Sequence, residues 1–172
     1  MRVLILGGTV AVGASVVQCL VGRGHEVSAL VRSAASAGRL RDMGARSLSG
    51  DIRDPEQWLG EAVERVDAVV HAAATFTDDM GVVDQALVEA FLPRLRASGR
   101  SPTLLYTGGC WLYPALLWGD GGGVLAGFAD DARRLGRVRV VGGETIRWPL
   151  VHRKDLAVLN ARAGERATGR RL

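Results

Sequence analysis

The first thirteen residues, MRVLILGGTVAVG, constrain the fold more than any other stretch of the chain. Val3 to Leu6 form an unbroken apolar run, which predicts a strand buried on both faces, as in the centre of a parallel sheet. Gly7, Gly8 and Gly13 follow, and a helical pattern then spans Ala11 to Val21. A strand, a glycine turn and a helix N-terminus together predict a diphosphate site, because backbone N–H groups point outward there and the helix dipole favours an anion.

One position of this turn departs from the usual spacing of glycines. Val10 stands at the middle position of Gly7-x-x-Val10-x-x-Gly13. A β-branched residue is a poor choice where a backbone must approach a phosphate closely. Two interpretations therefore stay open: a nucleotide site, and a purely structural turn between a strand and a helix.

The pattern of the first turn recurs along the chain as alternating strands and helices. The strands that we expect after the first are Val27–Val31, Ala45–Leu48, Asp67–His71 and Ser101–Tyr106. Helices are expected at Ala34–Met43, after Asp54 as N-cap with Pro55 as the first helical residue, and at Asp79–Ser98, which contains Pro93. This alternation predicts an α/β fold with a doubly wound parallel sheet, helices on both faces and a ligand at the carboxyl ends of the strands.

Composition limits the classes of protein that this chain can belong to. Its 172 residues suit one domain, and a hydrophobic content of 48% argues against disorder. The sequence has no apolar run near the roughly 20 residues of a membrane helix and no pattern of a signal peptide, so we expect a cytoplasmic protein without membrane contact. Cys19 and Cys110 are far apart and lie in no C-x-x-C pair, which predicts packed thiols and no metal site.

The formal net charge of +4 comes almost entirely from arginine, since Lys154 is the only lysine. Such a bias is typical of solvated arginines or of affinity for phosphorylated ligands. No basic run is interleaved with aromatic residues, so a nucleic-acid partner is not expected.

Several side chains follow the expected strands and are candidates for ligand binding. Arg32 and Ser33 follow the second strand. An acidic residue at this position would favour NAD, whereas an arginine would pair with the 2′-phosphate of NADP. The alternative is that the Arg32 side chain is simply solvated. Asp51 and Ile52 lie where the third strand's loop would meet an adenine, although Asp51 also suits a solvated turn. His71 invites an acid–base role, but a lone histidine at a strand end is more often structural.

Five motifs, taken in order, resemble the short-chain dehydrogenase/reductase superfamily, specifically its extended branch, the NAD-dependent epimerase/dehydratase family. They are GGTVAVG at Gly7–Gly13, GDIRD at Gly50–Asp54, DAVVHAAA at Asp67–Ala74, LLYTGGCWLY at Leu104–Tyr113 and RWPLVHRKDLA at Arg147–Ala157. The resemblance implies a Rossmann fold with strand order 3-2-1-4-5. It also implies a bound NAD(P) and hydride chemistry on a sugar nucleotide or a small carbonyl substrate, in the manner of an oxidoreductase or epimerase.

The resemblance also assigns the cofactor-binding residues. By analogy, the pyrophosphate would be lined by Gly7, Thr9, Val10, Ala11, Val12 and Gly13. Arg32 and Ser33 would meet the adenosine 2′-phosphate, and Asp51 and Ile52 would flank the adenine. Ala72, Ala73 and Ala74 would pass along the cofactor to its nicotinamide half, with NADP expected and NAD as the alternative.

The catalytic unit of the family, a Ser/Thr and a Tyr-x-x-x-Lys, is missing. Leu150 stands four residues before Lys154, and Gly108 or Gly109 occupies the position of the serine, which leaves Thr107 as the nearest hydroxyl. A helix and most of a strand that the family carries have no room between Tyr113 and Pro114. We therefore expect no catalytic residue and impaired turnover.

The remaining expectations concern organisation and partners. Residues 1–113 would form the dinucleotide-binding domain, and residues 114–172 a truncated substrate region packed on it. Within that region we expect a strand-six segment at Pro114–Gly123, a helix at Val124–Leu135, strands at Val138–Val141 and Ile146–Val151, and a last helix at Leu156–Ala163 capped by Asp155.

The Asp79–Ser98 helix would mediate self-association. Besides an active enzyme, a non-catalytic dinucleotide-binding sensor or partner and a decayed family member remain open.

Overall fold

The computed structural model describes residues 1–97, 99, 102–107, 116–119, 122–136 and 150–167. Its strands are β1 (Arg2–Leu6), β2 (Glu26–Val31), β3 (Arg46–Ser49), β4 (Ala68–His71), β5 (Thr103–Tyr106), β6 (Leu116–Gly119), β7 (Gly122–Gly123) and β8 (Leu150–His152). Its helices are α1 (Ala11–Gly22), α2 (Ala34–Asp42), α3 (Leu59–Glu64), α4 (Met80–Ala97), α5 (Val124–Leu135) and α6 (Arg153–Ala167).

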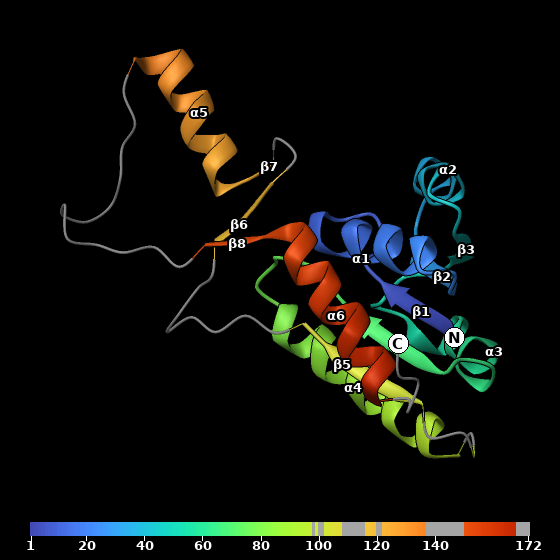
Figure 1. Ribbon diagram of the computed structural model, residues 1–172. Coiled ribbons are helices and arrows are strands. Elements are labelled where there is room, and N and C mark those ends of the chain that lie inside the picture. The colour runs from blue at the N-terminus through green and yellow to red at the C-terminus, as the bar shows by residue number, and fades with distance from the viewer. Residues whose placement is uncertain (98, 100–101, 108–115, 120–121, 137–149, 168–172) are drawn as a thin grey trace.

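Five strands form one parallel sheet in the order β3-β2-β1-β4-β5, which confirms the predicted fold class and strand order (Figure 1). β1 is central, and four of its five residues are buried. Its register places Leu6 between Leu30 of β2 and His71 of β4. The turns that follow these strands therefore gather at one edge of the sheet.

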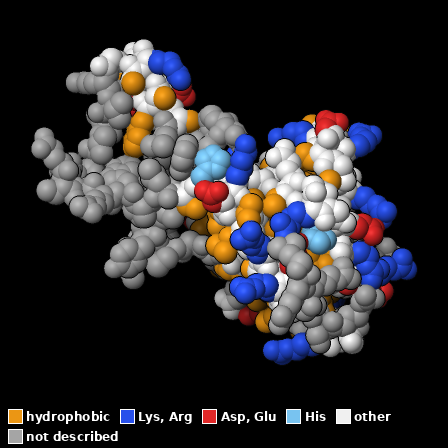
Figure 2. Space-filling model, in the orientation of Figure 1, with side chains coloured by type: hydrophobic (Ala, Val, Ile, Leu, Met, Phe, Trp, Pro, Cys, Tyr) orange, Lys and Arg blue, Asp and Glu red, His pale blue; other side chains and the backbone are white. Residues whose placement is uncertain are grey.

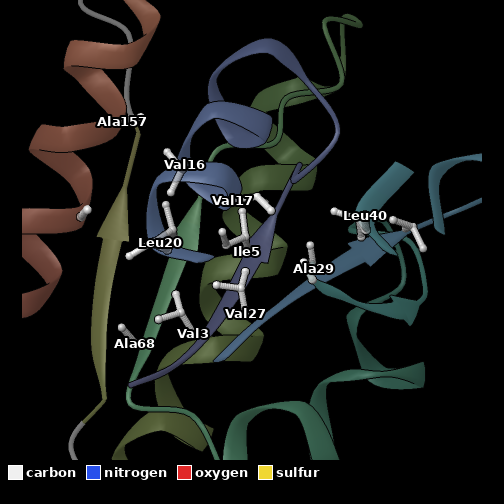
Figure 3. Close-up of a cluster of buried hydrophobic side chains, with 14 residues drawn as sticks. Val3, Ile5, Val16, Val17, Leu20, Val27, Ala29, Leu40, Ala68 and Ala157 are labelled. Atoms are coloured by element: carbon white, nitrogen blue, oxygen red, sulfur yellow. The ribbon is translucent and has the colours of Figure 1, made fainter. Parts of the chain in front are cut away.

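The alternating side chains of the strands supply two separate cores, one on each face of the sheet. Val3 and Ile5 of β1 pack under α1, α2 and α6, and Figure 3 shows Val16 and Leu20 of α1 over these strands. Leu4 of β1 points to the opposite face, where α3 and α4 cover the sheet. Burying a side chain of this size stabilises the fold by about 1.5–3 kcal/mol, so helices on both faces hold the central strand in place.

The segment after β5 forms a second sheet of three strands, in the order β7-β6-β8. β6 pairs antiparallel with β7 and parallel with β8. Figure 1 shows α5 projecting away from the five-stranded sheet, whereas α6 returns to it and lies beside α1. Ala157 and Ala161 of α6 are each 1% exposed, because their small side chains let this helix pack closely on the core.

One prediction of helix capping was right in position and one was wrong. Asp54 and Pro55 do take the N-cap and first positions, but of a 3₁₀ turn, Pro55–Gln57, and the Asp54 carboxylate accepts a hydrogen bond from the Gln57 side chain instead of from a backbone N–H group. Asp155 lies inside the first turn of α6, since that helix already begins at Arg153.

Other expectations are met or lie outside the described residues. The helix at Val124–Leu135 is confirmed as α5. Cys19 is a free, half-buried thiol against the core, and burial raises its pKa. Cys110 and the strand expected at Val138–Val141 lie outside the described residues.

The described surface shows mixed charge. Figure 2 shows lysine and arginine side chains dispersed among acidic and apolar ones over the face in view. Within the part of the chain that the structure describes, no helix is long and apolar enough to cross a membrane.

Candidate functional site

The turn after β1 depends on two glycines that lie against neighbouring backbone. Gly7 has a φ of +82°, and a Cβ atom on it would lie 2.8 Å from the Cα atom of Ala73, which follows β4. A Cβ atom on Gly13 would lie only 2.0 Å from the Gly7 carbonyl oxygen. These contacts let the first turn of α1 rest directly on the end of β1.

Val10 occupies the N-cap position of α1. Its backbone is extended, with φ −85° and ψ 167°, so it needs no glycine for conformational reasons. No side chain caps this helix end, and the first N–H groups of a helix lack intrahelical partners. The Val10 side chain is 44% exposed beside those groups, where a ligand's phosphate would have to share space with it.

A cleft of about 590 Å³ lies at the carboxyl ends of β1, β2 and β3 and beside the segment after β4. Nine of the predicted cofactor-binding residues line it: Gly7, Thr9, Val10, Arg32, Ser33, Asp51, Ile52, Ala73 and Ala74. Four others, namely Ala11, Val12, Gly13 and Ala72, are not among its lining residues. The structure thus gathers most of the predicted residues around one cavity, while dinucleotide binding by each of them stays a prediction.

Arg32 and Ser33 play different parts at the end of β2. The Arg32 side chain is 75% exposed, and its Nη1 atom lies 3.7 Å from Asp51 Oδ2, which is a loose ion pair. The Ser33 hydroxyl oxygen accepts a hydrogen bond from the Ser36 amide as the N-cap of α2. The Arg32 guanidinium is therefore available to an incoming anion, whereas the Ser33 hydroxyl oxygen already caps the N-terminus of α2.

Asp51 and Ile52 are held by the loop that follows β3. The Asp51 carboxylate accepts a hydrogen bond from the Arg53 amide at 3.0 Å, as in an Asx turn. The Trp58 indole donates to the Asp51 carbonyl oxygen at 2.7 Å and lies under Gly50, where a Cβ atom would come within 2.6 Å of the ring. This loop is consequently anchored to the core and presents a fixed wall to the cleft.

Seven further residues line the cleft and are not among those predicted from the sequence: Leu30, Val31, Ser36, Gly50, Arg53, Thr75 and Thr77. Arg53 is the most informative of them, since its guanidinium donates hydrogen bonds to Thr77 and to both carboxylate oxygens of Asp79. These contacts lower the pKa of Asp79 to about 2, with Arg53 as the main cause. Arg53 directly follows the predicted Asp51–Ile52 pair, but nothing in the sequence indicates its partners 24 and 26 residues away.

The cleft has features that fit a dinucleotide. The Thr75 hydroxyl oxygen is buried in its wall without a hydrogen-bond partner, and a polar ligand group would satisfy it. Gly7 leaves its part of the lining free of side-chain atoms, and Arg32 supplies an exposed positive charge. The residues present thus fit a phosphate-containing ligand that also carries polar groups.

His71 belongs to a hydrogen-bonded cluster with a structural character. It is 3% exposed, and its Nε2 atom donates to Asp84 of α4 at 2.7 Å. The Tyr106 hydroxyl donates to the same carboxylate, and its ring meets the imidazole edge-on at a centroid distance of 5.1 Å. Burial lowers the pKa of His71 against the opposing effect of Asp84, while Asp84 raises the pKa of Tyr106.

The residues described around the cleft include no lysine and no tyrosine. Lys154 lies in the first turn of α6, away from these lining residues. The Thr107 hydroxyl oxygen is buried without a hydrogen-bond partner just after β5. Gly108, Gly109 and Tyr113 lie outside the described residues.

Comparison with known proteins places this geometry in a family. The family model for NAD(P)H-binding proteins matches residues 7–99, more than half of the chain. The photosystem II assembly factor Ycf39 of Synechocystis sp. is 38% identical over 97 residues, which cover 56% of this chain and 29% of that protein. The 2-alkyl-3-oxoalkanoate reductase of Stenotrophomonas maltophilia is 40% identical over 74 residues, which cover 43% and 22% of the two chains.

A solved structure supports the same fold over nearly the whole chain. The UDP-N-acetylglucosamine 4-epimerase of Bacillus cereus aligns with a TM-score of 0.71 at 16% identity, covering 96% of this chain and 72% of that one. The matched segments span about three tenths or less of the two curated relatives' own length. The glycine turn, the parallel sheet and the family match agree, and the chain belongs to the NAD(P)H-binding family of Rossmann-fold proteins.

Proposed function

We propose that the protein binds NADPH in preference to NADH in the cleft that follows β1, β2 and β3. The observation that carries this proposal is the exposed Arg32 guanidinium at the end of β2, where an acidic residue would be expected to bind the ribose of NAD. Gly7, Thr9 and Val10, with Ala11, Val12 and Gly13 behind them, would surround the pyrophosphate. Ser33 would lie beside the 2′-phosphate, and Asp51 and Ile52 beside the adenine.

The nicotinamide half would run along Ala72, Ala73 and Ala74. The orphaned Thr75 hydroxyl supports this direction, because it offers a hydrogen bond to a ribose or carboxamide group. When bound, the cofactor would supply or accept a hydride. The described residues of the cleft contain no side chain arranged as an acid–base partner for that step, so we infer that turnover is impaired.

Titration of the purified protein with NADPH and NADH tests this proposal. We expect a preference for NADPH that Arg32→Met reduces roughly 10- to 100-fold, since a charged hydrogen bond contributes about 1.5–3 kcal/mol. Arg46→Met is the matched control, because Arg46 pairs with Glu26 and does not line the cleft. Val10→Gly should tighten binding of both cofactors. Equal affinities for NADPH and NADH, unchanged by Arg32→Met, would contradict the assignment of Arg32.

A second candidate function is that of a non-catalytic, dinucleotide-dependent partner of other proteins. The similarity to Ycf39, a photosystem II assembly factor, favours it. Self-association through α4 belongs to the same proposal, although its apolar stripe of Leu87, Phe91 and Leu95 is buried and its exposed apolar side chains lie on different sides of the helix. Oxidation of NADPH with a sugar nucleotide or small carbonyl compound would favour the enzyme. A complex whose formation depends on NADPH, without turnover, would favour the partner.

A further inference from the structure

One arginine joins two loops that both contribute residues to the lining of the cleft. Arg53 follows β3, whereas Thr77 and Asp79 lie between β4 and α4. Its Nη2 atom donates to Thr77 Oγ1 at 3.1 Å and to Asp79 Oδ1 at 3.2 Å, and its Nη1 atom donates to Asp79 Oδ2. The Thr77 hydroxyl also donates to Asp79 at 2.5 Å. The three side chains therefore form a closed set of hydrogen bonds, and two of them line the cleft.

Both ends of this connection are fixed to the rest of the fold. On one side, the Arg53 amide donates to Asp51, whose carbonyl oxygen accepts from the buried Trp58. On the other side, the Asp79 carbonyl oxygen accepts from the Val83 amide in the first turn of α4 at 3.0 Å. A change in the separation of the two loops would have to break one of these contacts.

The second loop adopts an unfavourable backbone conformation next to the connection. Phe76 has a φ of 53°, the left-handed region, which bulky side chains rarely adopt. It lies between Thr75 and Thr77, which both line the cleft, and its own side chain is 86% exposed. Such a conformation persists only where surrounding contacts impose it, and the hydrogen bonds of Thr77 and Asp79 are contacts of this kind.

We propose that Arg53, Thr77 and Asp79 form a strap that sets the distance between the loop beside the proposed adenine site and the loop that leads to the proposed nicotinamide site. Arg53 is then a positioning residue, which acts on affinity through Asp79. This inference rests on the proposed dinucleotide binding. It differs from a role as a free positive charge, because the guanidinium is already committed to a carboxylate.

Calorimetric titration with ADP and with NADPH tests the strap in Arg53→Met, Asp79→Asn and the control Arg46→Met. We expect Arg53→Met and Asp79→Asn to bind ADP and NADPH about 5- to 10-fold more weakly than wild type. Their thermal unfolding should stay close to that of wild type. Arg46→Met should bind both ligands as wild type does. The conservative Arg53→Lys should recover part of the affinity. The double variant Arg53→Glu/Asp79→Arg should bind better than either of its single substitutions.

Each other outcome has a definite meaning. Wild-type protein that binds neither ligand would overturn the proposed function and the strap with it. Wild-type binding that both strap variants retain would overturn the strap alone. Weak binding by Arg53→Met with normal binding by Asp79→Asn would also overturn it, because Arg53 would then contact the ligand directly. Asp79→Asn keeps the size of the side chain, so its affinity for ADP and NADPH tests the strap if Arg53→Met fails to fold.

Discussion

Two arginine–carboxylate clusters of this protein share their chemistry and differ in burial. Arg23 donates to both carboxylate oxygens of Glu165, whose side chain is 6% exposed, and His25 adds a third hydrogen bond at 2.9 Å. Arg53 meets Asp79 in the same bidentate way, but these side chains are 40% and 48% exposed. The pKa of each carboxyl is lowered to about 2.

Equal pKa values do not mean equal contributions to folding. Water screens an exposed pair, which typically contributes 0–1 kcal/mol, whereas breaking a buried pair leaves an uncompensated charge and costs about 3–5 kcal/mol. The Arg23–Glu165 cluster joins α6 to the residues between α1 and β2, so it belongs to the fold. The Arg53–Asp79 cluster joins two loops around the cleft, so its effect should be on binding.

The largest expected effect comes from the buried cluster. Glu165→Gln keeps the shape of the side chain but leaves Arg23 without its counter-charge. We expect a loss of about 2–3 kcal/mol in the free energy of unfolding, below the range for a fully buried pair because the Arg23 side chain is 24% exposed. Urea denaturation followed by circular dichroism measures it. Glu26→Gln is the matched control, since Glu26 is half exposed beside Arg46 and should cost under about 0.5 kcal/mol. Equal losses in the two variants would show that burial does not increase the contribution of the Glu165 carboxylate.

Acid should remove the same contribution. Arg23 and then His25 lower the pKa of Glu165 from 4.5 to about 2, so between these values the unfolded chain binds a proton that the folded chain does not. This stabilisation is present above about pH 5 and is lost as the pH falls towards 2. The difference in unfolding free energy between wild type and Glu165→Gln should therefore shrink by on the order of 2 kcal/mol over that range. Asp79 is present in both proteins, so its titration cancels, and a constant difference would exclude this role of Glu165.

Most of the sheet could be predicted because each of its signals is local. The Val3–Leu6 run, the glycine turn and the later apolar runs each specify an element, and the alternation of strands and helices specifies the parallel order. The two clusters could not be predicted. Arg23 and Glu165 are 142 residues apart in the chain, and no local pattern indicates that α6 returns to α1.

The candidate site likewise contains residues that local sequence signals predict and residues that only distant contacts place there. Residues adjacent to the predicted strand ends, such as Arg32 and Asp51, do line the cleft, because the carboxyl ends of parallel strands meet at one edge. Thr77 was missed because the loop after Ala74 carries no motif. Its place is fixed by a hydrogen bond from Arg53, which is 24 residues away in the chain, and it follows a left-handed residue, Phe76, that no sequence signal indicates.

The exposed cluster should affect stability much less than the buried one. We expect Arg53→Met to lower the free energy of unfolding far less than Glu165→Gln does, in the absence of ligand, because its ion pair is screened by water. Denaturation in low salt and in 1 M NaCl measures both the size and the screening of this effect. A loss comparable to that of Glu165→Gln would mean that the Arg53–Asp79 cluster stabilises the fold as much as the buried cluster does. This result would contradict the expected difference between the two clusters.

The smallest effect is expected at Phe76, the residue whose backbone the exposed cluster holds. Asparagine tolerates the left-handed region better than phenylalanine, and an 86% exposed ring gives up little burial when it is removed. We therefore expect Phe76→Asn to raise the free energy of unfolding by about 0.5 kcal/mol. Phe76→Ala is the control, since it removes the ring without improving the backbone preference and should leave stability near wild type. A loss of stability in both variants would mean that the ring itself packs against the protein, and the strained loop would then be held by Phe76 rather than by Arg53 and Asp79.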